Sequence, residues 1–391
     1  MSPAQPPCGR TFVIGFRRWR AWNLAPILRA EAGTIVFVRN CHAALARSPC
    51  DSDRVIVWGT ANPAGLDALI VSSGARLVRI EDGFIRSVGL GSDLIAPHSL
   101  AFDDRGIYFD ATRPSALEHL LMTAPDDAAL AARAAALRRF IVARGLTKYN
   151  VESDTAPVWR NDARPVVLVP GQVETDASIA LGCGAITTNL ALLRAARAAR
   201  PDAFLVYKPH PDVLARNRRG ALAHALRVAD HVETGASIIA CLARADEVHT
   251  MTSLSGFDAL LRGVRVVTYG APFYAGWGLT DDRAADHPAF ARRTRRVMLD
   301  QLVAATLLLY PRYWDPAAGR FATAEAALET LATTRDALAQ GPAPDRLIRG
   351  LLRRQQRKVK VLARAWLARP LAGSDDRGSN GASGGQTAIA P

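Results

Sequence analysis

Short runs of β-branched and other apolar residues recur along the chain, and stretches with helical periodicity separate them. Most of these runs are continuously apolar, which is typical of parallel strands that helices cover on both faces. Strands that alternate with helices indicate an α/β fold. Strands are predicted at residues 11–14, 34–38, 54–58, 76–80 and 107–109 in the first half, and at 166–169, 204–207, 247–251 and 264–269 in the second.

The middle of the chain predicts a boundary between two α/β units. An Ala-, Leu- and Arg-rich helix is expected over residues 126–144, and residues 145–162 have mixed polarity and weak periodicity. A chain of 391 residues also exceeds what one hydrophobic core usually organises. We therefore predict two Rossmann-like α/β domains, residues 1–150 and 151–340, that face a cleft. Nucleotide-sugar transferases of the GT-B type and periplasmic binding proteins both have this arrangement, so it does not identify a function.

Positive charge is concentrated near the C-terminus. The formal net charge is +13, and nine Lys or Arg residues with no acid among them lie between Arg346 and Arg369. The body is close to neutral and lacks the basic and aromatic pattern of a nucleic-acid surface, so no nucleic-acid partner is expected. Residues 341–372 predict a basic amphipathic helix that associates with a membrane, or that packs back across the two domains. Residues 373–391, rich in Gly and Ser, are expected to be disordered.

We expect neither a membrane span nor a secretory signal. No run of about eighteen apolar residues occurs, and the N-terminus lacks a charged region followed by an apolar one. The protein is therefore expected in the cytoplasm. Its five cysteines are scattered, without a CxxC pair, and are expected to be free thiols.

The segment after the predicted strand 166–169 presents polar residues at the carboxyl end of a buried strand. A Pro-Gly pair ends the strand and leads to Gln172, Glu174 and Asp176. Open α/β sheets bind ligands at this edge, so the three side chains are candidates for contact with a sugar. Asp176 is equally suited to capping the following helix, and its position alone does not decide between the two roles.

Two prolines hold a histidine at the end of the next predicted strand. In the sequence LVYKPHPD, Pro209 and Pro211 restrict the backbone on both sides of His210. A rigid imidazole beside Lys208 suits a phosphate or a leaving-group oxygen, as hydrogen-bond donor or as acid. A single His is usually structural, but the prolines and the neighbouring Lys favour a functional role.

The sequence HTMTSLSGFDALLRG predicts a strand, a turn rich in hydroxyl groups and then a helix. Ser253, Ser255 and Gly256 lie where the free N–H groups of that helix point outward, which favours a bound phosphate. Ser is also an ordinary N-cap residue. The phosphate interpretation therefore depends on Asp176 and His210 lying at equivalent strand ends.

A pair of acids follows a predicted strand in the first half. Glu81 and Asp82 come directly after residues 76–80 and suit acid–base chemistry or contact with a sugar hydroxyl. Asp51 and Asp53 have the DxD form of metal-dependent glycosyltransferases, but they precede a strand and stand close to a proline. We interpret the DxD as a turn and expect no metal site.

A glycine-rich loop carries aromatic residues late in the second half. In YGAPFYAGWGLTDD, Tyr274 and Trp277 are separated by small residues. Their rings can stack on a sugar or nucleobase, or they can pack beneath a crossover loop. Both interpretations stay open at this point.

Several long motifs together resemble a known family. The motifs EDGFIRSVGLGSD, LTKYN, VLVPGQVETDASI, VYKPHPDV, ADEVHTMTSLSGFDALL and FYAGWGLTDD are similar, in the same order, to those of the bacterial capsule polysaccharide β-Kdo transferases. The resemblance covers about residues 55–314. Long members of that family carry two related transferase modules, and this chain resembles one module, more closely the second.

The resemblance implies a GT-B-like enzyme that uses CMP-Kdo without a metal or other cofactor. It implies that Kdo is added with retention to a lipid-linked Kdo acceptor, the linker that anchors capsule chains. By position, Asp176 matches the family's nucleophile and His210 the histidine that contacts the CMP phosphate. Ser253 and Ser255 match phosphate-binding hydroxyls, and Glu81 matches the acidic residue of the other domain.

The chain departs from the family pattern in two ways, of which the first leaves Asp176 as the remaining candidate nucleophile and the second affects the expected partners. Thr175 stands where long members often have a second acid next to the nucleophile. The chain also lacks a tandem module, so a second Kdo transferase and the capsule export machinery are expected partners, together with the anionic inner face of the plasma membrane. Two alternatives remain: a non-catalytic carbohydrate-binding protein of capsule assembly or export, and a transferase for another CMP-activated nonulosonic acid.

Overall fold

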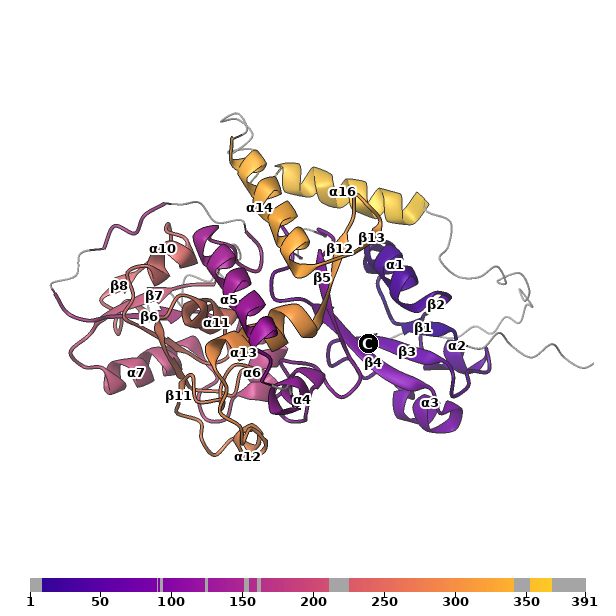
Figure 1. The fold of residues 1–391 in the computed structure, drawn as a ribbon, viewed down its shortest axis with the longest axis horizontal. Coiled ribbons are helices and arrows are strands. Elements are labelled where there is room, and N and C mark those ends of the chain that lie inside the picture. Colours follow the sequence, from indigo (N-terminus) through magenta and orange to yellow (C-terminus); the bar gives the residue numbers. More distant parts are fainter. Residues whose placement is uncertain are drawn as a thin grey trace, which may run out of the picture.

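The chain forms two β-sheets, each surrounded by helices (Figure 1). The sheets lie in separate lobes, with α5 (Ala128–Ala143) and α13 (Leu299–Val303) between them in this view. The α/β class with two sheets is confirmed. This computed structural model describes residues 9–89, 91, 94–123, 126–150, 155–159, 163–210, 225–340 and 352–367.

The first sheet combines a parallel half with an antiparallel edge. Its order is β13-β12-β5-β4-β3-β1-β2. The pairs among β1, β2, β3 and β4 are parallel, whereas β5 is antiparallel to both β4 and β12, and β12 is antiparallel to β13. The strands are β1 (Thr11–Ile14), β2 (Ile35–Val38), β3 (Arg54–Trp58), β4 (Arg76–Asp82), β5 (Ser99–Asp103), β12 (Pro311–Asp315) and β13 (Arg320–Ala322).

The second sheet is parallel in every pair that the structure describes. Its order is β11-β10-β9-β6-β7-β8, and all residues of β6, β7 and β9 are buried. In the sequence, such strands appear as continuous apolar runs because helices cover both faces of the sheet. The strands are β6 (Val166–Pro170), β7 (Phe204–Lys208), β8 (His231–Val232), β9 (Glu247–Thr250), β10 (Arg265–Thr268) and β11 (Asp281–Asp282).

Polar N-caps start many of the helices that follow these strands. Asp176, Thr188, Ser237 and Ser253 each accept a backbone N–H at the start of a helix, which satisfies one of its free donors. The remaining helices are α1 (Arg18–Ala32), α2 (Cys41–Leu45), α3 (Leu66–Ser73), α4 (Ala116–Thr123), α6 (Ala177–Gly182), α7 (Asn189–Ala199), α10 (Ile238–Leu242), α11 (Leu254–Leu261), α12 (Pro288–Arg292), a π-helical turn (Ala304–Leu309), α14 (Ala324–Gln340) and α16 (Leu352–Leu367).

Most predicted strands lie within a residue or two of the observed ones, and one prediction is wrong. Residues 107–109 form no strand but turn through the interior, where Ile107 is completely buried. Their apolar character reflects packing rather than pairing. The strand that pairs with β4 is instead β5, which carries Ser99 and Asp103 at its ends and was not predicted.

The chain returns to the first sheet near its C-terminal end. The predicted boundary after residue 150 separates β5 from β6. However, β12 and β13 pair within the first sheet, so residues 311–322 do not belong with the second sheet as residues 151–340 were predicted to. This return closes the edge of the first sheet next to β5.

A shared hydrophobic core joins the two lobes. Phe84, which follows β4, lies 4.7 Å from Phe273 and 4.6 Å from Tyr108 between ring centroids, and Phe273 lies 5.4 Å from Phe257 of α11. We call these four rings the aromatic joint. A buried ion pair adds to it, because Glu118 of α4 accepts from Arg293 at 3.1 Å. The carboxyl ends of β4 and of the second sheet's strands therefore face one another in a fixed arrangement.

The C-terminal helix α16 packs one face on α1. Arg18 of α1 donates to the carbonyl oxygens of Ala365 at 2.6 Å and Trp366 at 2.8 Å, and Ala365 is buried. Val359 and Leu362 are exposed, as is the side chain of Trp366. One face of α16 therefore packs against the body of the protein, as one of the two predictions for this segment had it, while another face is exposed. The predicted disordered tail, residues 373–391, lies outside the described residues.

In the part of the chain that the structure describes, no helix has the length and apolar character needed to cross a membrane. Cys41, Cys50, Cys183 and Cys241 are free thiols, as predicted, and Cys8 lies outside the described residues.

Candidate active site

A cavity of about 460 Å³ lies between the two sheets, at the carboxyl ends of their strands. Both lobes contribute to its walls, because it is lined by the end of β4 and by the loops that follow β6, β7 and β9. Ligand-binding residues were predicted at these strand ends, and the structure brings most of them together. Of the predicted residues, Glu81, Asp82, Gln172, Asp176, Lys208, His210, Ser253 and Ser255 line the cavity.

Asp176 both caps a helix and faces the cavity. Its Oδ1 accepts the Ser178 N–H at 2.9 Å, which starts α6, and its side chain is exposed along the cavity wall. The two roles that the sequence left open are therefore compatible. Nearby, Gln172 accepts the Thr252 N–H and donates to the Thr252 hydroxyl, both at 3.0 Å. This reciprocal contact ties the loop after β6 to the turn after β9.

Three groups with donors converge on the second-sheet side of the cavity. Lys208 is buried at the end of β7 and donates to the Ala236 carbonyl at 2.6 Å, and His210 lines the cavity two residues later. Ser253 caps α11 by accepting the Ser255 N–H at 3.2 Å. A cationic group, an imidazole and a helix N-terminus at one place suit an anion.

Glu174 and Gly256 do not line the cavity, which corrects their assignment to sugar and phosphate binding. The Glu174 carboxylate accepts the backbone N–H of Asn189 at 2.8 Å and its side-chain N–H at 3.1 Å, so it anchors the start of α7. Gly256 is buried inside α11, where a Cβ would lie 2.2 Å from the Tyr274 hydroxyl oxygen. Glycine is present there to allow close packing.

Tyr274 and Trp277 are packing residues, and the expectation that they stack on a sugar is wrong. Both are completely buried and neither lines the cavity. The Tyr274 hydroxyl donates to the Ser253 carbonyl at 2.6 Å, and Trp277 Nε1 donates to the Phe273 carbonyl at 2.8 Å. Phe273, from the same loop, does line the cavity and belongs to the aromatic joint.

The two acids on the first-sheet side lie in different environments. Asp82 pairs with Arg86 at 2.7 Å, and its backbone N–H donates to Glu81 Oε1 at 3.0 Å. Burial and the neighbouring Asp82 charge raise the pKa of Glu81 to about 7. Glu81 can therefore exchange a proton near neutral pH, which suits a general base.

Residues from the segment Leu146–Asn150 complete this wall, although no role was predicted for them from the sequence. Thr147, Lys148 and Tyr149 line the cavity with Tyr108 and Phe109. The LTKYN motif carried the family resemblance. Nothing in its composition indicated that the segment runs beside Glu81 and Asp82.

The DxD sequence forms the turn that was predicted. Asp53 is buried, pairs with Arg10 at 2.7 Å and accepts the Cys50 N–H at 3.0 Å. These donors, which outweigh burial, lower the pKa of Asp53. Nowhere in the described ranges do three or more His, Cys, Asp or Glu side chains gather in a way that could hold a metal ion.

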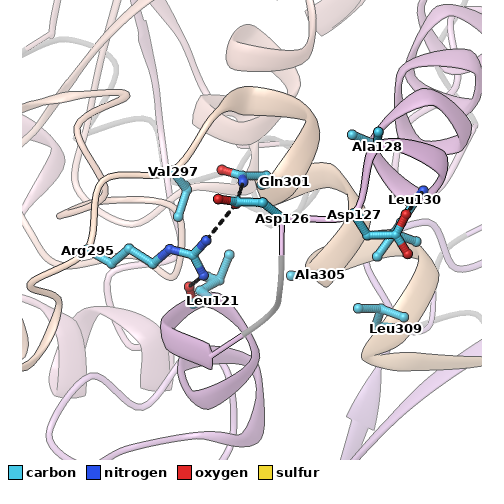
Figure 2. Close-up of a pocket in the computed structure, with 12 residues that line it drawn as sticks. Leu121, Asp126, Asp127, Ala128, Leu130, Arg295, Val297, Gln301, Ala305 and Leu309 are labelled. Atoms are coloured by element: carbon cyan, nitrogen blue, oxygen red, sulfur yellow. Dashed lines mark hydrogen bonds and ion pairs between the residues drawn. The ribbon is translucent and has the colours of Figure 1, made fainter.

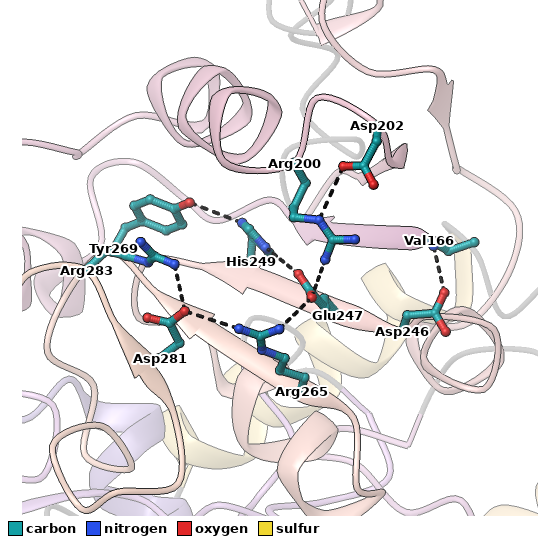
Figure 3. A network of polar contacts seen from close by, with 10 residues as sticks. All are labelled: Val166, Arg200, Asp202, Asp246, Glu247, His249, Arg265, Tyr269, Asp281 and Arg283. Atoms are coloured by element: carbon teal, nitrogen blue, oxygen red, sulfur yellow. Dashed lines mark hydrogen bonds and ion pairs between the residues drawn. The ribbon is translucent and has the colours of Figure 1, made fainter. Parts of the chain in front are cut away.

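Two other regions of the structure lie outside this cavity. Figure 3 shows buried His249 between Glu247 and Tyr269, with 3.2 Å to each partner, while Arg200 and Arg265 pair with Glu247. This network neutralises a buried carboxylate on the second sheet. Burial lowers the pKa of His249.

The second region is a smaller cavity of about 220 Å³ (Figure 2). It is lined mainly by apolar residues of α5 and the π-helical turn, and Asp126 pairs with Arg295 at its rim at 2.9 Å. No predicted site residue lies there.

Two α/β lobes with a cavity at the facing strand ends define a GT-B-like protein. Two solved structures of KpsC from Thermosulfurimonas dismutans have this architecture. The β-Kdo 2,7 transferase structure matches with a TM-score of 0.68 and 35% identity, over 83% of this chain and 99% of that one. The β-Kdo 2,4 transferase structure matches with a TM-score of 0.70 and 31% identity, over 82% and 97%.

Two sequence relatives match most of the chain. The chain is 40% identical over 365 residues to the capsule polysaccharide modification protein LipA of Neisseria meningitidis serogroup A, which is 92% of this chain and 50% of LipA. It is 42% identical over 288 residues to the lipopolysaccharide-processing protein LpsZ of Rhizobium meliloti, 72% of this chain and 64% of LpsZ. This chain thus spans about half the length of LipA.

The model of the capsule polysaccharide biosynthesis protein family matches residues 53–150 and 142–313. The chain therefore belongs to the capsule polysaccharide biosynthesis family. The match includes every residue that lines the cavity.

Gly256→Ala is expected to lower the free energy of unfolding by roughly 1–3 kcal/mol, because the new methyl group overlaps the Tyr274 ring and hydroxyl. Urea denaturation measures this change. Gly184→Ala is the matched control, since a Cβ at that exposed position meets nothing within 4 Å. Equal stability of the two variants would contradict the packing role of Gly256.

Proposed function

We propose that this protein transfers Kdo from CMP-Kdo to a lipid-linked Kdo acceptor, with retention, in capsular polysaccharide biosynthesis. The observation that carries the proposal is one cavity in which residues of the second sheet face Glu81 of the first. The second sheet contributes Asp176 and a group of donors that we call the phosphate corner: Lys208, His210, Ser253 and Ser255. The 35% and 31% identity to two β-Kdo transferase structures supports the sugar and the reaction class.

Asp176 is the proposed nucleophile. Its carboxylate attacks the anomeric carbon of Kdo as the bond from that carbon to the CMP phosphate oxygen breaks, and CMP leaves with the electron pair. An acceptor hydroxyl then attacks the same carbon and releases the carboxylate. Two displacements restore the original configuration, as in retaining glycosidases.

Departure of CMP places negative charge on its phosphate. His210, the Ser253 and Ser255 hydroxyls and the N-terminus of α11 lie along one side of the cavity and can donate to this phosphate. Lys208 adds a positive charge from the end of β7. Donors held in place before the reaction stabilise charge as it develops, so this mechanism needs no metal or other cofactor.

Glu81 is the proposed base for the acceptor hydroxyl. It lies on the opposite wall from the phosphate corner, at the end of β4. Its raised pKa makes it a better proton acceptor than an ordinary carboxylate while it still ionises near neutral pH. Asp82 and Gln172, which also line the cavity, are candidates to contact sugar hydroxyls.

Two other functions are tested by the same assay. A carbohydrate-binding protein of capsule assembly would bind CMP-Kdo or its acceptor without turnover. A transferase for another nonulosonic acid would accept a different CMP-sugar in preference to CMP-Kdo. Incubation with CMP-Kdo and a synthetic mono-Kdo glycolipid, followed by product mass and linkage analysis, distinguishes these functions from the proposed one.

Asp176→Asn is expected to reduce transfer by more than about a thousandfold, because the amide cannot form the glycosyl–enzyme bond. Asn caps helices as well as Asp does, so α6 and the free energy of unfolding should change little. Steady-state assays measure transfer, and titration calorimetry should find nearly unchanged CMP affinity. A rate close to that of the wild type would refute the nucleophile assignment.

The rate of transfer should rise with pH with a midpoint of about 7, because Glu81 must lose its proton before it can act as a base. Glu81→Gln should remove this rise and lower the rate roughly 10²- to 10⁴-fold. The measurement is kcat/KM from about pH 5.5 to about pH 8.5. If the variant keeps the wild-type profile, another group is responsible for the midpoint.

We further propose that α16 holds the protein on the anionic inner face of the plasma membrane, near its lipid-linked acceptor. The helix contains six Lys or Arg residues and no acid. Its outer face combines exposed Val359, Leu362 and Trp366 with exposed Lys360 and Arg364. Such side chains can insert shallowly while the cations contact lipid headgroups. A second Kdo transferase and the capsule export machinery are further proposed partners.

Reversal of two charges in the double variant Lys360→Glu and Arg364→Glu is expected to weaken binding to phosphatidylglycerol-containing liposomes by more than about tenfold, since each cation contributes about 1 kcal/mol at such a surface. Sedimentation at low salt measures binding. The control is Arg139→Glu with Arg320→Glu, two exposed positions elsewhere that give the same net charge. Equal loss in both double variants would refute a specific role of α16.

A further inference from the structure

One positively charged side chain of the cavity, Lys148, has no part in the mechanism above. Lys148 lines the wall that also carries Glu81, Asp82 and Tyr108. It is part of the segment Leu146–Asn150, which connects the two lobes.

The backbone of this segment is fixed against the loop that follows β4. The carbonyl oxygen of Lys148 accepts the Arg86 N–H at 2.9 Å and the Ser87 N–H at 3.3 Å, and that of Tyr149 accepts the Gly89 N–H at 2.8 Å. The Asn150 side chain donates to the Ser87 carbonyl at 3.1 Å. The Lys148 side chain therefore starts from a defined position beside the cavity.

The ammonium group of Lys148 lacks a direct partner. Across the ranges that the structure describes, neither a hydrogen bond nor an ion pair within 4 Å reaches it, and Nζ lies 5.5 Å from the centroid of the Tyr149 ring. A lysine has three donors, and leaving them unused in a partly buried place is unfavourable unless a ligand or water meets them. Burial lowers the pKa of Lys148, but Tyr108, Tyr149 and the two acids outweigh it and raise the pKa overall, so the group stays charged.

The position of Lys148 indicates which ligand it serves. Lys208, His210 and the N-terminus of α11 already supply the donors for a phosphate on the second-sheet side. Lys148 lies instead on the first-sheet wall with Glu81, the group that would receive a proton from the acceptor hydroxyl. An anion bound by Lys148 would therefore lie on the molecule that carries this hydroxyl.

We propose that Lys148 binds the carboxylate of an acidic sugar at the acceptor end and so selects acceptors whose terminal sugar carries a carboxylate. The inference rests on the proposed transferase function. A Lys contact with a carboxylate is a charge-assisted hydrogen bond, which is lost if that carboxyl group is made neutral.

The test compares one synthetic Kdo glycolipid acceptor with its carboxyl methyl ester, both with CMP-Kdo as donor. The wild type should use the acid with kcat/KM at least about tenfold above that for the ester. Lys148→Met should lower kcat/KM for the acid by a similar factor, leave that for the ester within about twofold, and leave KM for CMP-Kdo unchanged. Lys148→Arg should recover part of the preference for the acid. Arg139→Met, which removes an exposed cation from α5, is the matched control and should behave as the wild type.

Three results would overturn the proposal. Equal use of the acid and the ester by the wild type requires no variant and refutes it directly. If Lys148→Met lowers kcat/KM equally for both acceptors and shifts the pH midpoint, then Lys148 acts only through the pKa of Glu81. A raised KM for CMP-Kdo would place the bound carboxylate on the donor.

A failure of the proposed function is distinguishable from a failure of this inference. If the wild type transfers no Kdo to either acceptor, saturation-transfer NMR with Kdo methyl glycoside and its methyl ester measures binding without turnover. Preference for the free acid in the wild type, absent in Lys148→Met, would support the carboxylate site on its own. Equal signals from acid and ester would refute it.

Discussion

The aromatic joint is the contact on which the rest of this structure depends. Each lobe alone has polar groups at the ends of its strands, and only their mutual position makes a site. Phe84 follows the acids of β4. Phe257 belongs to α11, whose N-terminus forms part of the phosphate corner, and Phe273 belongs to the loop after β10. Aromatic pairs of this kind contribute about 0.5–1.5 kcal/mol each beyond their buried area. Because Tyr108 and Phe273 also line the cavity, the residues that hold the lobes together form part of its wall.

The cavity separates two kinds of electrostatic environment. On the second-sheet side, Lys208, His210 and a helix N-terminus favour negative charge. On the first-sheet side, burial and the charge of Asp82 raise the pKa of Glu81, and Arg86 pairs with Asp82. This division fits a reaction in which an anionic leaving group departs at the second-sheet wall and a hydroxyl loses its proton at the first-sheet wall. The described residues of this one chain supply both walls, although the chain spans half the length of LipA.

The parts of the fold that local pattern determines could be predicted from the sequence. β6 and β7 are buried on both faces and read as apolar runs, and the polar residues after them had to lie at one sheet edge. Long-range pairing could not be predicted: β12 joins β5 across some two hundred residues. Burial explains two wrong predictions, since residues 107–109 and the Tyr274–Trp277 loop are apolar because they pack in the interior. Lys148 was missed because its role depends on where a connecting segment runs, which its own residues do not encode.

One short stretch after β4 links the joint, the acids and the segment that carries Lys148. Glu81 and Asp82 end the strand, Phe84 enters the joint, and the backbone from Arg86 to Gly89 donates to Lys148 and Tyr149. A displacement of Phe84 would therefore move the proposed base and the proposed carboxylate site together, while the phosphate corner, built on β7 and α11, would keep its internal contacts. Disturbing this stretch should thus affect the acceptor side of the cavity more than the binding of CMP.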